Sequence, residues 1–380
     1  MWRVRRKEKD IVGLTLLFLL FSACTDEVKL RTDISGTSRA VIYGSDDRLD
    51  YYEHPNAVFQ RLARESSVAL VHESLLENGE NGEIRLPAES MGEVFGLCPD
   101  ERFWNQPAVA ECSGTLVDDD LVLTAGHCVE QVPCAEWRFV LGYYYEASTQ
   151  LHTITDEQVY HCQRVIAAEV SERDADFEVD YAWILLDRPV ISPYGPAPVF
   201  KGDSSIERGA SVTVVSYGAG LPVKIDSGGQ VVDERPLSLD YFITTNDNFH
   251  GGSGAGVYDS AGNLRGIVAR GEDDYILDAE TADCLRLRTD SNDRFEAAEE
   301  ATYIANALNG LCITDENQRG VCEGVAVEAD TSSGDASEEV NADINESHRR
   351  DASCALSSPV SSQYSIVGET LSAFFYLPAK

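Results

Sequence analysis

The strongest constraint on the fold is a long series of short apolar runs between residues 64 and 290. Examples are "SSVALV", "LVLTAG", "DYAWILLD", "ASVTVVSYG" and "LRGIVARG". Gly, Asp, Asn or Pro separates nearly every pair of runs, and such punctuation is typical of strands joined by turns in an antiparallel sandwich or barrel. No repeat with a period of about 20 to 50 residues is found, which argues against a solenoid or propeller. We therefore expect an all-β domain in this part of the chain.

The start of the chain has the pattern of an export signal. A basic opening, "MWRVRRK", leads into the uncharged run "IVGLTLLFLLFSA" before Cys24, and this run is shorter than the roughly 20 apolar residues of a membrane span. "FSAC" resembles the lipobox of bacterial lipoproteins, which implies removal of residues 1–23 and lipidation of Cys24. Ordinary signal cleavage and an uncleaved anchor are the alternatives. We expect an exported protein, either a lipoprotein of the bacterial cell envelope or secreted, with residues 24–63 as an N-terminal linker or pro-like segment.

The cysteines indicate the redox compartment of the protein, and the net charge limits the classes of partner that it can bind. The chain has 10 cysteines. Without Cys24 nine remain, scattered without metal-ligand spacing, so in an oxidising compartment we expect disulfides with one thiol left over. The formal net charge of −35 argues against nucleic acid as a partner, because phosphate binding needs concentrated Lys and Arg. Protein or peptide partners remain. We expect a monomer that meets a membrane only through a lipid on Cys24.

One helix and a tail are expected after the strands. "SND" supplies Asn292 or Asp293 as an N-cap, and apolar residues at helical spacing lead to Gly310 as the stop signal. The apolar residues are Ala301, Ile304, Ala305 and Leu308. Residues 312–353 are predicted to be a disulfide-containing segment followed by an acidic linker with little to bury, and residues 354–380 a short C-terminal tail.

The segment "CSGTLVDDDLVLTAGHCV", residues 112–129, places His127 beside Cys128 at the end of a predicted strand. It resembles the histidine segment of the chymotrypsin-clan, or trypsin-like, serine proteases, both in "LTAGHC" and in the spacing of Cys112 and Cys128. The resemblance implies two six-stranded antiparallel β-barrels with the cleft between them, a C-terminal helix and a Cys112–Cys128 disulfide. We place the protease domain at residues 64–311.

Proteases of this clan need a base, a carboxylate and a nucleophile in the chain order His, Asp, Ser. The resemblance implies His127 as general base and acid, Asp180 in "EVDYAWILLD" as the orienting carboxylate, and Ser253 in "NDNFHGGSGAGV" as the nucleophile. Four nearby acids compete with Asp180: Asp174, Asp176, Glu178 and Asp187. The implied oxyanion hole consists of the amides of Gly251 and Ser253, since side chains in this turn would block the substrate.

Gly252 stands where trypsin-like enzymes carry an aspartate that pairs with a new N-terminus after zymogen cleavage. Its absence therefore concerns activation and not the chemistry of Ser253. The chain also resembles the bacterial glutamyl endopeptidase branch, which lacks that aspartate. The shared features are the compact spacing of the second half of the triad and the segment "AVIYGSDDR".

The resemblance assigns Asp247 and Gly271 to substrate binding. Asp247 aligns with the acidic floor of the trypsin specificity pocket, which predicts cleavage after Arg or Lys, although a turn cap is the alternative for this residue. Gly271 would leave the mouth of the pocket open, and His250 is expected at the rim of the cleft. No cofactor or metal is required. The rival hypothesis is a catalytically inactive, protease-fold binding protein at the cell envelope.

Overall fold

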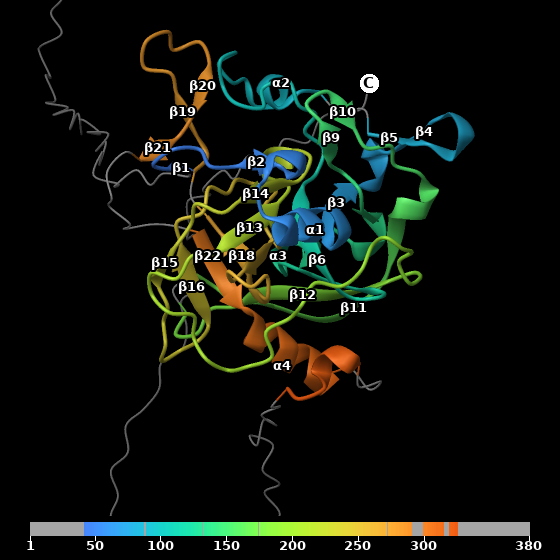
Figure 1. Cartoon of the computed structure of the whole chain (residues 1–380), viewed down its shortest axis with the longest axis vertical. Helices are drawn as coiled ribbons and strands as arrows, with labels where there is room; N and C mark the ends of the chain where they lie inside the picture. The colour runs from blue at the N-terminus through green and yellow to red at the C-terminus, as the bar shows by residue number, and fades with distance from the viewer. Residues whose placement is uncertain are drawn as a thin grey trace, which may run out of the picture. The chain divides into compact units, whose positions relative to one another are not determined.

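The computed structural model of the chain describes residues 42–86, 89–130, 132–173, 175–271, 273–290, 299–314 and 319–325. The predicted signal with Cys24, the helix cap at Asn292 or Asp293, the acidic linker and the C-terminal tail lie outside these residues. The described chain is mostly β, with a few helices (Figure 1). None of its helices has both the length and the apolar character to cross a membrane.

Six strands close into an antiparallel barrel in the order β11-β12-β7-β6-β3-β8. They are β3 (Ser67–His72), β6 (Cys112–Asp118), β7 (Leu121–Thr124), β8 (Trp137–Val140), β11 (Val159–Val170) and β12 (Asp180–Leu186). Side chains including Leu70, Leu116, Val122, Phe139 and Ile184 form one buried cluster. The first of the two predicted barrels is therefore confirmed.

The second half of the fold is an antiparallel sheet of eight strands in the order β15-β16-β22-β18-β17-β13-β14-β2. They are β2 (Leu49–Asp50), β13 (Thr213–Ser216), β14 (Lys224–Asp226), β15 (Val231–Asp233), β16 (Tyr241–Thr244), β17 (Gly256–Tyr258), β18 (Leu264–Arg270) and β22 (Glu299–Tyr303). In the described residues this sheet is not closed, unlike the six-stranded barrel expected there. One reason is that β2, which comes from far upstream, pairs with β14 and occupies that edge.

The N-terminal segment is part of the folded domain from residue 42 onward, which corrects the prediction of a linker over residues 24–63. β1 (Ile42–Tyr43) pairs with β21 (Thr289–Asp290). α1 (Ala57–Glu65) begins where the side chain of Asn56 accepts a hydrogen bond from the Val58 amide, and it buries Phe59, Leu62 and Ala63. The sequence pattern missed this helix because only a narrow apolar face interrupts its polar residues.

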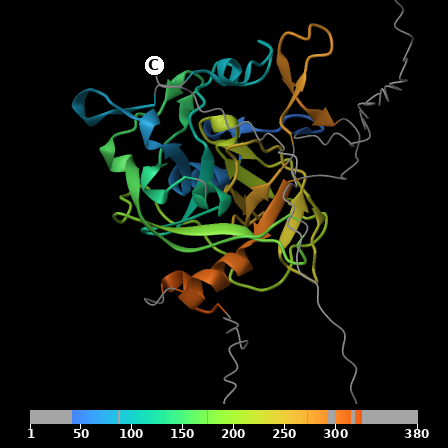
Figure 2. The same cartoon turned by 180° about the vertical axis from the view of Figure 1, so that it is seen from behind.

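The C-terminal helix exists but starts later than predicted. Residues 299–303 form β22, paired on both sides by β16 and β18, and α4 (Ile304–Thr314) follows directly. Gly310 does not end this helix. A Cβ at Gly310 would lie 2.1 Å from the Tyr181 hydroxyl oxygen, so the glycine permits close packing of α4 on β12. Both views show α4 alongside β11 and β12 (Figures 1 and 2).

All the described cysteines are paired in four disulfides: Cys98–Cys284, Cys112–Cys128, Cys134–Cys162 and Cys312–Cys322. The set includes the predicted Cys112–Cys128 bridge. Several disulfides are consistent with an extracellular protease. The remaining elements are α2 (Met91–Phe95), α3 (His127–Glu130), β4 (Glu77–Asn78), β5 (Ile84–Arg85), β9 (Tyr145–Ala147), β10 (Gln150–Leu151), β19 (Tyr275–Leu277) and β20 (Leu285–Leu287).

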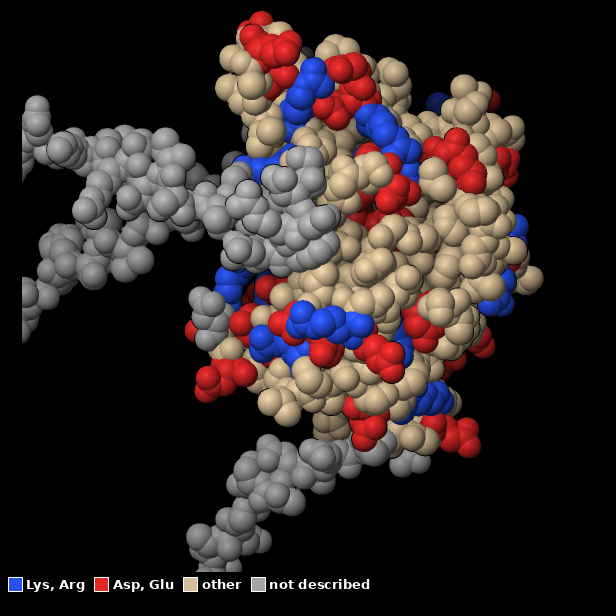
Figure 3. All heavy atoms as spheres, turned by 60° about the vertical axis from the view of Figure 1, so that its left-hand side comes forward, with Lys and Arg blue, Asp and Glu red and all other residues tan. Residues whose placement is uncertain are grey.

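Charges of opposite sign are interspersed on one face of the molecule (Figure 3). On the face drawn in Figure 3, Lys and Arg side chains lie among Asp and Glu side chains. The described part of this face therefore presents no continuous basic patch of the kind that follows a phosphate backbone.

Candidate active site

His127 is the first residue of α3 and lies three positions after Thr124, the last residue of the buried strand β7. Its Nδ1 lies 2.6 Å from Oδ2 of Asp180, and its backbone amide donates to Oδ1 of the same carboxylate at 3.1 Å. The Asp180 side chain is 2% exposed and that of His127 33%. Because an ionised carboxylate only accepts hydrogen bonds, Nδ1 carries the proton and Nε2 of a neutral ring is left as an acceptor.

The loop that carries Ser253 is tied to the histidine segment through β6. The Ser113 amide donates to the carbonyl of Ser253 at 2.8 Å, and its hydroxyl donates to the carbonyl of Gly251 at 2.7 Å. Ser113 follows Cys112, whose disulfide partner Cys128 follows His127. The Cys128 sulfur itself lies 3.9 Å from the Ser253 carbonyl oxygen. One compact frame therefore holds both segments, although no hydrogen bond joins Nε2 of His127 to Oγ of Ser253, both of which the structure describes.

The peptide between His250 and Gly251 is held by a backbone hydrogen bond on its carbonyl side. The carbonyl of His250 accepts a hydrogen bond from the Ala219 amide at 2.6 Å. In a trans peptide the adjoining N–H points the opposite way, so the Gly251 amide faces away from Ala219. Gly251 has a φ of +90°, which favours glycine. Among the described residues, no hydrogen bond uses the amide of Gly251 or of Ser253.

Residues 112–267 match the protein family described as "Trypsin-like peptidase domain". Over this segment, which is 156 of its 380 residues, the chain is similar to trypsin-like peptidases. Its fold supports a serine protease, whereas nothing in the match favours the glutamyl endopeptidase branch over other members.

Two solved structures are similar to this chain. One is Rv3671c from M. tuberculosis H37Rv, crystallised as a serine-to-alanine mutant in an inactive form. It is 13% identical, with 70% of this chain and 93% of that chain covered and a TM-score of 0.39. The other is kallikrein-related peptidase 10, which is 16% identical, with 54% of this chain and 89% of that chain covered and a TM-score of 0.35.

The acids that compete with Asp180 have other surroundings. Glu178 pairs with Arg270 at 2.9 Å, and Asp187 accepts from the His161 amide at 3.0 Å at the far end of β12. Asp176 is exposed, and Asp174 lies outside the described residues. Among the described candidates, Asp180 is the one bound to the imidazole of His127.

Asp247 is bound by the N-terminal segment of the peptidase domain, which differs from the free carboxylate expected at the floor of a pocket. Its two carboxylate oxygens accept hydrogen bonds from the backbone amides of Tyr43 and Asp47, each at 2.9 Å. The residue is 3% exposed. Burial and the neighbouring Asp226 carboxylate raise the pKa of Asp247. Its contacts are those of a residue that fastens residues 43–47 to the loop before Ser253.

Arg48 continues this attachment. Its guanidinium pairs with Asp46 at 2.9 Å and lies 3.9 Å from the centre of the Phe249 ring. Phe249 directly precedes His250, so a residue far upstream supports the turn that carries Ser253. A cation over an aromatic face in a buried site contributes about 2 kcal/mol.

Gly271 lies where expected, at the end of β18, but its acidic neighbour is Glu299 rather than Asp247. A Cβ at Gly271 would lie 2.5 Å from Oε2 of Glu299. The same oxygen accepts from the Asn248 side chain at 3.3 Å, and Glu299 is 2% exposed. Glu299 is not among the site residues predicted from the sequence, because the sequence pattern predicts a helix over this stretch. Strand alternation in "EEATY" was the signal that could have placed it.

Gly252 has a steric explanation that does not involve zymogen activation. A Cβ at this position would lie 1.9 Å from Oδ1 of Asn248. The loop in this conformation therefore excludes the aspartate of trypsin-like enzymes, and Asn248 occupies the space beside the turn.

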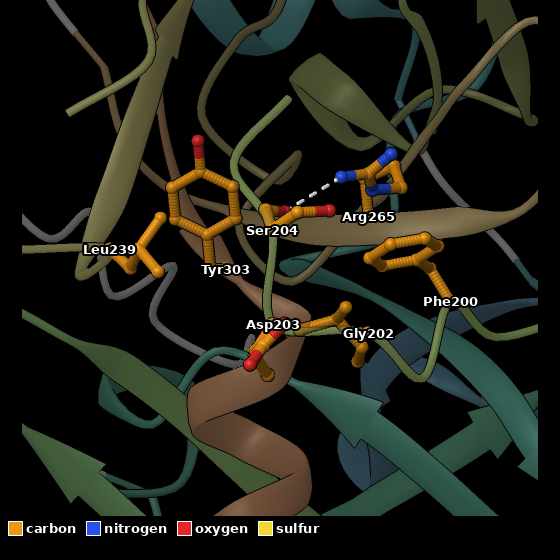
Figure 4. A pocket seen from close by; sticks show the side chains of 9 residues that line it. Phe200, Gly202, Asp203, Ser204, Leu239, Arg265 and Tyr303 are labelled. Atoms are coloured by element: carbon orange, nitrogen blue, oxygen red, sulfur yellow. Dashed lines mark hydrogen bonds between the residues drawn. The ribbon is translucent and has the colours of Figure 1, made fainter. Parts of the chain in front are cut away.

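Two other features do not provide a second site. The pocket in Figure 4, lined among others by Phe200, Arg265 and Tyr303, has a volume of about 10 Å³, which is room for about one water molecule. Cys112, His127 and Cys128 form a group with metal-ligand atoms close together. However, both cysteines are in the Cys112–Cys128 disulfide and offer no thiolate.

Proposed function

We propose that this protein is a serine endopeptidase in which Ser253 is the nucleophile, His127 the general base and acid, and Asp180 the orienting carboxylate. The observation that carries the proposal is the pair of hydrogen bonds from His127 to Asp180, 2.6 and 3.1 Å long. They fix the imidazole in the tautomer that a base needs, within the frame that also holds the Ser253 loop.

The proposed reaction proceeds through an acyl-enzyme. Nε2 of His127 accepts the hydroxyl proton of Ser253 while Oγ bonds to the carbonyl carbon of the peptide, and the resulting oxyanion accepts hydrogen bonds from the amides of Gly251 and Ser253. The imidazolium then donates its proton to the leaving nitrogen as the C–N bond breaks. Water repeats the sequence on the ester and regenerates Ser253.

The rival function, a non-catalytic binding protein on a protease fold, predicts no reaction at Ser253. A fluorophosphonate probe and a peptide library test the difference directly. We expect covalent labelling of Ser253, located by mass spectrometry, together with cleavage of a subset of peptides. A correctly disulfide-bonded protein that is neither labelled nor active on any peptide would support the rival.

We further propose a preference for Arg or Lys before the cleaved bond, with Glu299 in place of Asp247 as the attracting carboxylate. The contact of Glu299 with Gly271 supports this assignment, as does the engagement of Asp247 by residues 43–47. A buried carboxylate favours a cationic partner over a neutral one.

Glu299→Gln is expected to reduce kcat/KM for peptides with Arg or Lys at the cleaved bond by about tenfold or more, since one charge-assisted contact contributes about 1.5 to 3 kcal/mol. Peptides with a neutral residue there should change little. The matched control is Glu300→Gln, because Glu300 is the next residue on β22 and pairs with Arg270. An unchanged ratio of basic to neutral substrates in Glu299→Gln would contradict the assignment.

Export is the cellular setting that we propose, with the signal of residues 1–23 removed and Cys24 lipidated. The four disulfides support an oxidising compartment. Mass spectrometry of the mature N-terminus distinguishes a diacylated Cys24 from an unmodified start, and retention of residues 1–23 would contradict both forms of cleavage.

A further inference from the structure

His250 and Asp274 form a second imidazole–carboxylate pair, separate from His127 and Asp180. Nδ1 of His250 lies 2.6 Å from Oδ2 of Asp274, and the His250 amide donates to the same oxygen at 3.0 Å. The Asp274 side chain is 2% exposed and that of His250 79%. The buried carboxylate fixes the position of the ring, and no hydrogen bond among the described residues uses Nε2.

His250 sits on a well-supported part of the Ser253 loop. Its carbonyl is bound by the Ala219 amide at 2.6 Å, and the ring of Phe249 before it is covered by the Arg48 guanidinium at 3.9 Å. His250 precedes Ser253 by three positions, so their Cα atoms are at most about 11 Å apart. A peptide bound for attack by Ser253 has residues within reach of an imidazole held at that distance.

Charge gives this imidazole a preference among substrates. The hydrogen bond that His250 donates to Asp274 and the negative charge of Asp274 raise the pKa of His250, and Asp273, which itself pairs with Arg288 at 3.5 Å, adds to the effect. The ring is therefore protonated over a wider pH range than a free histidine. A protonated His250 is a positively charged group in a chain whose formal net charge is −35.

We propose that His250, held by Asp274, binds the carboxylate of an acidic side chain on the peptide substrate, close to the cleaved bond. This inference rests on the proposed peptidase function. Under this proposal the protein selects substrates at two positions, namely the residue before the cleaved bond and an acidic residue near that bond. The preferred substrates are then peptides with Asp or Glu near the cleaved bond.

The test uses pairs of peptides that differ only by Glu or Gln, placed in turn at each position around the cleaved bond of the best library substrate. At pH 6 we expect kcat/KM to favour Glu by about fivefold at one position, the ratio that a solvent-exposed ion pair provides. The ratio should fall towards one as the pH rises through the pKa of His250, because the neutral ring no longer attracts the carboxylate. A pH effect on the cleavage step itself acts on both peptides alike and cancels in the ratio.

His250→Gln is expected to remove the Glu preference at every pH, and its exposed position makes misfolding a small risk, which a thermal melt checks. His152→Gln is the matched control, since His152 forms an imidazole–carboxylate pair with Glu146 at 2.9 Å elsewhere on the surface. A second variant, Asp274→Asn, should shift the loss of the preference to lower pH.

The possible results distinguish a failure of the His250 proposal from a failure of the proposed peptidase activity. If no peptide of any sequence is cleaved, the peptidase proposal fails. If peptides are cleaved but the ratio of Glu to Gln stays near one at every position and pH, or survives in His250→Gln, the assignment of His250 is overturned.

Discussion

Replacement of Ser253 with Ala is expected to reduce turnover of peptide substrates by about 10⁴-fold or more. Without Oγ there is no acyl-enzyme, and any remaining hydrolysis depends on direct attack by water with help from the oxyanion amides. A loss of this size corresponds to about 5.5 kcal/mol of transition-state stabilisation. Steady-state kinetics on the best library peptide measure it, and covalent labelling by a fluorophosphonate should disappear in the same variant.

The fold should be unaffected, because the loop is held by backbone contacts. The carbonyl of Ser253 accepts from Ser113 at 2.8 Å, and the amide of Gly254 donates to Val268 at 2.7 Å, and alanine keeps both. Ser260→Ala is the matched control, since Ser260 is exposed in the turn after β17. Near-normal cleavage by Ser253→Ala, with a melting temperature like that of the unchanged protein, would remove Ser253 from the mechanism.

Local sequence patterns were sufficient to predict strands of the barrel and the position of His127. The runs around β6, β7 and β12 alternate or are continuously apolar and end in turn residues, and each became a strand. The phrase "LTAGHC" placed His127 at the end of β7, beside the Cys112–Cys128 bridge. These signals are short-range, so they can be read from one stretch of chain at a time.

The remaining features depend on contacts between segments far apart in the sequence. Asp247 accepts hydrogen bonds from the backbone amides of Tyr43 and Asp47, which lie about 200 positions earlier in the sequence. Glu299 lies beside Gly271 because β22 inserts between β16 and β18. No local period shows either arrangement, and the helix predicted over β22 failed because pairing with two neighbouring strands overrode the weak helical spacing.

Asp180→Asn is expected to lower turnover by about 10⁴-fold, close to the effect of losing the nucleophile. Oδ1 and Oδ2 of Asp180 each accept an N–H of His127. Asparagine has one accepting oxygen and one NH₂ donor, so it can satisfy only one of those groups. If the asparagine oxygen accepts the hydrogen bond from the His127 amide, its NH₂ group faces Nδ1. Nδ1 must then accept that hydrogen bond, so the ring carries its proton on Nε2. The imidazole then has no lone pair directed at Ser253, and it can no longer accept the hydroxyl proton.

Two measurements separate this tautomer effect from general destabilisation. The melting temperature of Asp180→Asn should fall little, because the Asp180 amide keeps its hydrogen bond to the Thr302 hydroxyl at 3.0 Å, whereas the rate of fluorophosphonate labelling should fall with turnover. Asp187→Asn is the matched control at the other end of β12, where the carboxylate accepts from His161 and pairs with Arg188, and its activity should stay within about twofold of the unchanged protein. Equal losses of activity in both variants would assign the effect to the strand and not to the imidazole, whereas a loss confined to Asp180→Asn is what an orienting carboxylate requires.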